Sequence, residues 1–284
     1  MSNKDLLDSI KKLREMTGVG FKDCKIALDE TKGDLEKSIE FLRKKGIAKA
    51  SKKMSRTASE GLVLVKEDQG QIAIIEINSE TDFVAKNQDF ITFCKELSDI
   101  NFIIKGNLDK LNEQKMANGS LVKDSLVNLI AKIGEKITIR RTNFFDNLNG
   151  SNFFYVHSAI EKNVGKIISI VKLEGIVKEK NEEIGGKIAM HIAASNPLAI
   201  TKDGIDKLIV DKELEIIKAE TTNSGKPVEM AEKISKGKIL KFLNDNSLLE
   251  QIWIMDPKKK VSDILKENFL EKEIKVLDFV KYKV

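Results

Sequence analysis

The apolar positions at the start of the chain follow a helical period. Three runs of apolar residues have this spacing: 6–13, 21–28 and 35–42. Gly33 suits the left-handed position that ends a helix, and Asp34 suits the cap that begins the next one. The pattern predicts three short helices, the third ending at Gly46, in a small bundle of the ubiquitin-associated type that serves by docking.

From Gly61 the period changes to two. Residues 61–80, GLVLVKEDQGQIAIIEINSE, predict a β-hairpin with its turn at Asp68-Gln69-Gly70. Helical patterns follow at 90–104 and 119–133, and a strand pattern follows at 136–145. This alternation predicts a first α+β unit that runs to about Asn149.

A second unit repeats the order of strands and then helices. Strands are predicted at 152–160, 165–175, 251–256 and 273–284, and helices at 181–195 and 261–268. The glycines Gly185 and Gly186 lower helix propensity and would permit close packing of the 181–195 helix on the sheet. Strands and helices in this order favour α+β layers over a βαβ array.

Residues 205–246 differ from the rest of the second unit. Two highly charged helical stretches with narrow apolar stripes are joined by Asn223-Ser224-Gly225-Lys226. Narrow stripes are typical of a projecting antiparallel helical hairpin, a coiled-coil arm. We therefore expect an α+β fold with a three-helix module and linker at 1–55, core halves at 56–149 and 150–284, and the arm inserted at about 203–246.

Composition limits the functional classes. Of 284 residues, 41% are hydrophobic and 33% charged, and the net charge of +5 is a small excess of 49 basic over 44 acidic groups, which does not require a nucleic-acid partner. No window is apolar enough to span a membrane, and the first residues resemble neither a signal nor a transit peptide, so we expect a cytoplasmic protein without membrane contact.

Catalytic and metal-binding motifs are absent from the sequence. It has no phosphate-binding GxxxxGK[ST] loop, no GxGxxG, no nucleophile elbow and no HExxH, and its two cysteines and two histidines lack zinc-site spacing. We expect Cys24 and Cys94 to be buried free thiols and His191 to be structural, whereas His157 is more open to a functional role. A binding protein without cofactor, metal site or catalytic residues is the preferred interpretation, and an enzyme with an unrecognised site is the alternative.

A basic stretch follows the third predicted helix and raises a second alternative. A nucleic-acid binder would use these side chains: Lys44, Lys45, Lys49, Lys52, Lys53 and Arg56. Residues 44–60 contain no aromatic side chain to stack on bases. A solvated helical linker is therefore favoured.

The segment TDFVAKN, residues 81–87, interrupts the strand pattern with an aromatic residue where turns usually place Gly, Pro, Asn or Ser. Two interpretations remain open from the residues alone. Thr81 or Asp82 caps the next helix while Phe83 packs inward near Ile74 and Ile91, or Phe83 points outward to a partner.

Several segments together resemble the bacterial elongation factor Ts family, the guanine-nucleotide exchange factors of elongation factor Tu. In chain order they are LREMTGVGFKDCKIALDETKGDLEKSIEFLRKKG, TDFVAKN, LVNLIAKIGEKITIRR, KIAMHIAASNP, KPVEMAEKISKGKILKF and IMDPKKKVSDIL. They cover essentially the whole chain, in order and with fitting spacing.

The resemblance implies a partner, elongation factor Tu in its GDP-bound and nucleotide-free forms, and roles for three groups of residues. Thr81, Asp82, Phe83 and Val84 are implied to disturb the partner's magnesium site. Val19, Gly20 and Phe21 are implied to dock on its nucleotide domain, and His157 is implied to touch it elsewhere. The run 158–166 after His157 is longer and more charged than is usual in the family. The arm is a candidate surface for the partner or for a homodimer.

Overall fold

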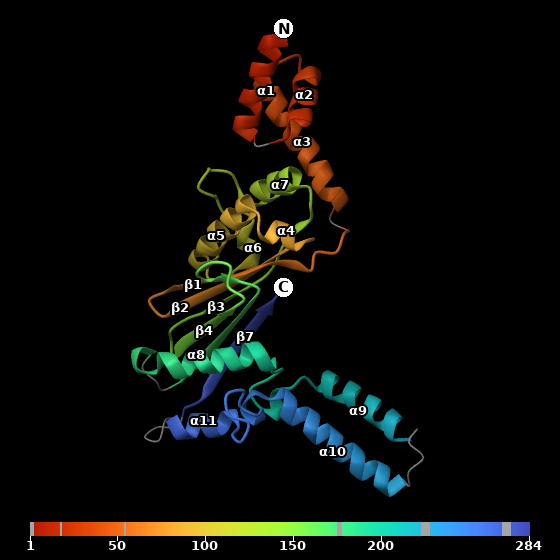
Figure 1. Ribbon diagram of the computed structural model, residues 1–284, viewed down its shortest axis with the longest axis vertical. Helices are drawn as coiled ribbons and strands as arrows, with labels where there is room; N and C mark the ends of the chain where they lie inside the picture. The colour runs from red at the N-terminus through yellow and green to blue at the C-terminus, as the bar shows by residue number, and fades with distance from the viewer. Residues whose placement is uncertain (1–2, 18, 54, 175–177, 223–227, 269–273) are drawn as a thin grey trace.

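The computed structural model describes residues 3–17, 19–53, 55–174, 178–222, 228–268 and 274–284. It is a mixed helix and sheet fold with two antiparallel sheets, which agrees with the expected α+β class. In Figure 1 the N-terminal helices lie at one end of the molecule, the sheets in the middle and a helical pair at the other end.

The N-terminal helices enclose a small core of their own. They are α1 (Asn3–Thr17), α2 (Phe21–Glu30) and α3 (Leu35–Lys53). Their buried core side chains are Ile10, Leu13, Cys24, Ala27, Leu28 and Leu42. Gly33 has a left-handed φ of 84°, and the Asp34 carboxylate accepts a hydrogen bond from Lys37 N at 3.0 Å, so the predicted boundary between α2 and α3 is confirmed.

The predicted end of the third helix at Gly46 is wrong, because α3 continues to Lys53. A Cβ atom placed on Gly46 would lie 3.5 Å from the Ala131 Cβ and 3.9 Å from Val127, both on α7 (Val122–Ile133). The glycine therefore marks the place where α3 passes close to the core. Part of the basic stretch after it is helical.

The first sheet carries the predicted hairpin. Its strands are β1 (Glu60–Asp68), β2 (Gln71–Ser79), β3 (Ile137–Phe145) and the short β5 (Val164–Gly165), in the order β3-β2-β1-β5. Gln69 and Gly70 form the turn with φ of 49° and 77°, the left-handed pair that a two-residue hairpin needs. A bulge interrupts the β2–β3 pairing between Glu76 and Ile77.

Helices cover one face of this sheet. Besides α7 they are α4 (Asp82–Ala85), α5 (Gln88–Ile103) and α6 (Leu108–Leu111). Phe90, Cys94 and Leu97 of α5 are fully buried against the inward residues of β1 and β2. The connection between β2 and α5 is thereby anchored at both ends in the buried core.

The second sheet has the order β4-β6-β7 and packs on α8. Its strands are β4 (Ser151–His157), β6 (Ile167–Leu173) and β7 (Val276–Lys283), with α8 (Lys178–Ser195) and α11 (Val261–Asn268) beside it. A side chain at Gly185 would overlap the Phe153 ring, whereas one at Gly186 would meet nothing within 4 Å. Only Gly185 serves the predicted close packing.

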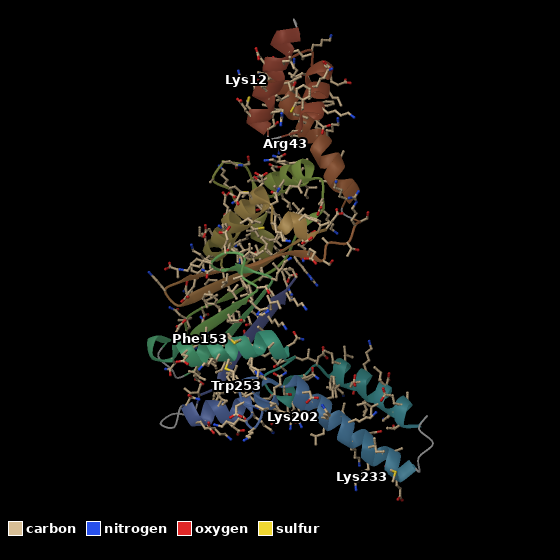
Figure 2. All side chains as sticks on the ribbon, in the orientation of Figure 1. Lys12, Arg43, Phe153, Lys202, Lys233 and Trp253 are labelled. Carbon is tan, nitrogen blue, oxygen red and sulfur yellow. The ribbon has the colours of Figure 1, made fainter. Side chains whose placement is uncertain are left out.

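The predicted strand at 251–256 is wrong. The segment follows a 3-10 turn (η2, Leu248–Glu250) and makes one isolated bridge, between Ile252 and Lys260. Within its apolar run, Trp253 is buried and stacks on the His191 ring of α8, with ring centroids 5.2 Å apart, whereas the neighbouring apolar residues are exposed. Phe153 and Trp253 both lie beside α8 in Figure 2.

Two long helices form the projection at the far end of the molecule. They are α9 (Lys207–Thr222) and α10 (Val228–Asn246), after a short 3-10 turn (η1, Lys202–Gly204), and the predicted connection at 223–226 lies outside the described residues. Ile217, Thr221 and Ser235 are buried between them, and the Thr221 and Ser235 hydroxyls lie 2.9 Å apart. A bridge between Ala199 and Ser247 closes the base of the pair.

The two sheets share a buried cluster. Val63, Val65 and Ile74 of the first sheet belong to it together with Ile168 and Ile170 of the second. Strand β5 lies beyond residue 150 in the chain but pairs with β1. The expected core halves are therefore linked by a strand as well as by apolar packing.

Candidate partner-binding site

The segment between β2 and α5 exposes one aromatic ring. Phe83, on the single turn α4, is 78% exposed, whereas Val84 and Ala85 beside it are buried in the core. Ile74 and Ile91 are buried too, so Phe83 does not pack among them. The structure therefore excludes inward packing of Phe83 and leaves its ring exposed, with Val84 packed inward instead.

The Thr81 side chain does not serve as the predicted helix cap. Thr81 occupies the N-cap position of α4, yet its side chain makes no capping hydrogen bond. Its hydroxyl donates instead to Glu135 Oε1 at 2.8 Å, and its backbone N–H donates to Glu135 Oε2 at 3.0 Å. The next helix, α5, is capped by Asn87, whose Oδ1 accepts from Asp89 N at 2.9 Å.

Asp82 places a negative charge next to the exposed ring. Its carboxylate pairs with Lys86 Nζ at 2.8 Å, one helical turn away. The hydrogen bond from Lys86 lowers the pKa of Asp82 below its ordinary value, and the nearby charge of Lys166 adds to this effect. Asp82 is therefore ionised at neutral pH, on the surface beside Phe83.

Lys166 also connects this region with the strand end that carries His157. Lys166 N donates to the His157 carbonyl at 3.3 Å, and Lys166 Nζ donates to Glu60 Oε2 at 2.7 Å. The His157 ring is exposed, and its Nδ1 lies 3.3 Å from the Tyr155 hydroxyl. Glu60 is the first residue of β1 and pairs with Ser79, the last residue of β2, three positions before Asp82.

The predicted docking residues of the N-terminal helices lie at the connection from α1 to α2 and at the first residue of α2, apart from the turn that carries Phe83. Gly20 is exposed with nothing within 4 Å of a built Cβ, Phe21 is 44% exposed and Val19 is half-buried. The structure thus presents a second exposed aromatic ring, on a different module from Phe83.

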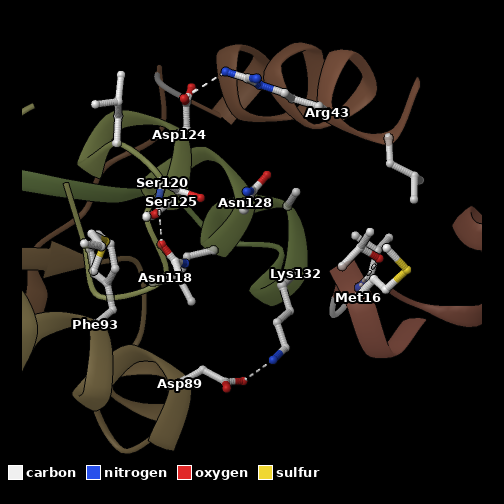
Figure 3. Close-up of a pocket in the computed structure, with 18 of the residues that line it drawn as sticks. Met16, Arg43, Asp89, Phe93, Asn118, Ser120, Asp124, Ser125, Asn128 and Lys132 are labelled. Atoms are coloured by element: carbon white, nitrogen blue, oxygen red, sulfur yellow. Dashed lines mark hydrogen bonds and ion pairs between the residues drawn. The ribbon is translucent and has the colours of Figure 1, made fainter. Parts of the chain in front are cut away.

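A pocket of about 770 Å³ separates the N-terminal helices from the core. Figure 3 shows Arg43 of α3 reaching across to Asp124 of α7, where the ion pair measures 2.8 Å, while Met16 lies on the bundle side. Asp89 and Lys132 form a second ion pair on the core side, also at 2.8 Å. The pocket is open and lined by paired charges.

Glu135 is the residue of this site that the sequence did not reveal. It lies 54 positions from Thr81 and follows the left-handed Gly134 that ends α7. Nothing in its local pattern distinguishes it from a surface glutamate. Its contact with Thr81 arises because the end of β2 lies beside the start of the antiparallel strand β3.

Other candidate chemistry lies in the interior. Burial raises the pKa of the Cys94 thiol well above its ordinary value and also raises that of Cys24. His191 is fully buried, with Nε2 lying 3.0 Å from Gln251 Oε1.

Within the described ranges, no group of three or more His, Cys, Asp or Glu side chains could hold a metal ion. No described helix is long and apolar enough to cross a membrane.

Comparison with known proteins gives a consistent result. Residues 80–284 match the family model described as Elongation factor TS. Elongation factor Ts of Rickettsia felis is 39% identical over 280 residues, which cover 97% of this chain and 90% of that protein. Elongation factor Ts of Rickettsia prowazekii is 41% identical over 277 residues, 96% of this chain and 89% of that protein. The chain belongs to the elongation factor Ts family of translation elongation factors.

Proposed function

We propose that this protein is a guanine-nucleotide exchange factor that binds elongation factor Tu and promotes release of its GDP. The observation that carries the proposal is Phe83, a ring 78% exposed on a turn whose neighbours Val84 and Ala85 are anchored in the core. Exposing a large apolar side chain to water is unfavourable, and the free energy falls when a partner covers it.

The mechanism follows from what holds a nucleotide in such a partner. Backbone amides of a phosphate-binding loop and a magnesium ion fix the phosphates of GDP. Phe83 enters the partner as an apolar wedge, a contact worth about 2–4 kcal/mol by the behaviour of buried aromatic anchors. Asp82, ionised beside it, competes for polar groups near the metal.

Thermodynamic linkage then sets the direction of the effect. The factor binds nucleotide-free partner more tightly than GDP-bound partner, so GDP weakens the factor's own binding by the same ratio. A thousandfold ratio corresponds to a coupling free energy of about 4 kcal/mol. No chemical step is performed by this chain.

The remaining modules extend the contact. The N-terminal helices, 1–55, act as a docking module of the ubiquitin-associated type and present Val19, Gly20 and Phe21. The second core half, 150–284, presents His157. The exposed position of Phe21 and His157 supports these assignments.

The contacts of the basic stretch argue against the nucleic-acid alternative. Lys44 pairs with Glu40, Lys45 with Asp23 and Arg56 with Glu80. Lys53 donates to the Gly134 carbonyl. These cations already have partners within the chain, which weakens the case for a phosphate-binding surface there.

Release of fluorescent GDP from elongation factor Tu, chased with excess unlabelled GDP, tests the proposal. We expect the release rate to rise with the concentration of this protein and to saturate. A rate that stays at the spontaneous value at every concentration would contradict the exchange function.

A further inference from the structure

We propose that Glu135 is a positioning residue that holds the turn carrying Phe83 in its outward orientation. The inference rests on the proposed exchange function. Glu135 would orient the turn so that Phe83 can contact the partner. Glu135 is half-buried on the connection between α7 and β3, so it acts on the turn from behind.

The contact is specific in its geometry. Both carboxylate oxygens of Glu135 are used by one residue, Thr81, at 2.8 and 3.0 Å. The Thr81 carbonyl also accepts a hydrogen bond from Ser79 Oγ at 3.0 Å. Thr81 is extended, with φ −127° and ψ 158°, and α4 begins at the next residue. Fixing Thr81 at three polar groups therefore fixes the direction in which α4 leaves the sheet.

A reciprocal contact joins the same two segments: Glu135 accepts from the residue after Glu80, and Glu80 accepts from the residue after Glu135. Glu80 Oε1 accepts a hydrogen bond from Lys136 N at 2.6 Å. The last backbone pair of β2 and β3 is Ser79 with Ile137. Side chains of residues 80 and 135 thus continue the β2–β3 contact beyond the point where the backbone ladder ends.

The end of α3 and the chain that follows it also contact the corner where β2 ends and β3 begins, which is formed by residues 80–81 and 134–136. Arg56 NH1 lies 3.3 Å from Glu80 Oε2, and Lys136 Nζ donates to the Arg56 carbonyl at 2.8 Å. Lys53 donates to the Gly134 carbonyl, one residue before Glu135. The corner that holds Phe83 is therefore braced by the segment that joins the N-terminal helices to the core.

This arrangement is more than a capping interaction would require. A threonine at an N-cap normally turns its hydroxyl to the helix it begins. Here the hydroxyl is turned away, to a carboxylate 54 positions along the chain. The contact with Glu135 fixes the position of the turn α4. The exposed aromatic side chain on that turn is Phe83.

The test uses matched variants in the GDP-release assay with the full chain. Glu135→Ala removes both contacts, while Glu135→Gln keeps them, because its amide oxygen accepts from Thr81 N–H and its NH₂ donates to the Thr81 hydroxyl. Thr81→Val removes the hydroxyl, and Thr81→Ser retains it. We expect about a tenfold lower maximal release rate for Glu135→Ala, the size of one charge-assisted hydrogen bond, and a near-native rate for Glu135→Gln.

A double-mutant cycle with Phe83→Ala separates positioning from general stability. If Glu135 acts through Phe83, Glu135→Ala lowers the maximal rate in the native background and has no further effect in the Phe83→Ala background. Equal losses in both backgrounds, after correction for the folded fraction, would overturn the inference. So would a native maximal rate in folded Glu135→Ala and Thr81→Val.

Amide hydrogen exchange in the free protein provides a readout that does not depend on elongation factor Tu. Exchange of the Thr81 and Lys86 amides, which donate hydrogen bonds to Glu135 and to the Phe83 carbonyl, is expected to rise at least tenfold in Glu135→Ala and to stay native in Glu135→Gln. Unchanged exchange in Glu135→Ala overturns the positioning role even if the native chain stimulates GDP release. Raised exchange together with an inactive native chain would instead overturn the proposed function and leave the hold on the turn in place.

Discussion

At the scale of single residues, the first sheet contains a fully buried carboxylate, Glu76. Arg140 NH1 lies 3.0 Å from one of its oxygens and Arg141 Nε lies 2.6 Å from the other. The bulge after Glu76 places two consecutive arginines of β3 on one glutamate. Arg141 also lies 4.1 Å above the Tyr282 ring of β7, so this ion cluster joins both sheets.

Glu76→Gln should therefore destabilise the fold. A neutral amide accepts weaker hydrogen bonds from the two guanidinium groups, and we expect the free energy of unfolding to fall by about 1–3 kcal/mol. Urea denaturation measures the change. Glu183→Gln is the control, because Glu183 pairs with Lys187 on an exposed helix face and should give no measurable effect. Equal effects in the two variants would contradict the role of the cluster.

The burial of His191 leads us to expect that the stability of the fold depends on pH. Burial lowers its pKa below the ordinary value of 6.5, with a smaller opposing effect from Gln251. Below about pH 6.5 the unfolded state binds the proton before the folded state does, so the free energy of unfolding falls as pH decreases toward the folded pKa. Urea midpoints between pH 7.5 and 5.5 should decline less steeply for His191→Gln than for the native chain. Parallel curves would exclude this contribution.

How far single residues can be predicted depends on whether their role is local. Phe83 was singled out because an aromatic ring at a strand end lacks a backbone reason, and the structure leaves it exposed. The importance of Glu135 could not be predicted, because its partner lies 54 positions away. Val84, grouped with Phe83 by the family motif, is buried and serves the core side of the turn.

At the scale of elements, α8 sits on the second sheet through one of its two adjacent glycines. A side chain at Gly185 would overlap the Phe153 ring, and one at Gly186 would meet open space. The sequence predicted close packing for both glycines, since both look alike along the chain. Only the rotation of the helix on the sheet decides between them.

Alanine at these two positions should have opposite effects. Gly185→Ala is expected to lower the free energy of unfolding by about 1–3 kcal/mol, because it overpacks the α8–β4 contact. Gly186→Ala should raise it by about 0.5–1 kcal/mol, because alanine favours the helix. Thermal or urea unfolding distinguishes the two. Destabilisation by both would show that α8 has a different rotation.

Elements defined by local signals were predicted well, and elements defined by distant contacts were not. The hairpin turn at Gln69-Gly70 needs only its own backbone geometry, and it was found where expected. Gly46 looks like a helix end, but α3 continues past it along α7. The apolar run at 252–255 looks like a strand, but only Trp253 in it is buried, stacked on His191, and its apolar neighbours are exposed.

At the scale of the whole molecule, the helical pair α9 and α10, the arm expected from the sequence, is joined to the core by backbone hydrogen bonds at its base. Leu198 N donates to the Asn246 carbonyl at 2.8 Å, and Leu248 N donates to the Ala199 carbonyl at 2.8 Å. The chain thus leaves and re-enters the core at neighbouring points. Ile217, Thr221 and Ser235 are buried in the seam of the arm itself.

Replacing residues 207–243 with a short Gly-Ser linker should leave the core folded. Trp253, the single tryptophan of the chain, is buried against His191 and reports on the core near the base of the arm. We expect an unchanged emission spectrum of the folded state and retained stimulation of GDP release. A red-shifted emission, as from an exposed indole, would show that the arm and the core fold as one unit.

The most direct test of the proposed mechanism compares two exposed apolar side chains at opposite ends of α5. Phe83 lies on α4 just before α5, which is about 24 Å long, and Ile103 is the last residue of α5, with 76% of its surface exposed. The measurement is the maximal rate of GDP release from elongation factor Tu with the native chain, Phe83→Ala and Ile103→Ala. We expect Phe83→Ala to lose at least thirtyfold, about 2 kcal/mol, and Ile103→Ala to keep the native rate. A native rate with folded Phe83→Ala would contradict the wedge mechanism.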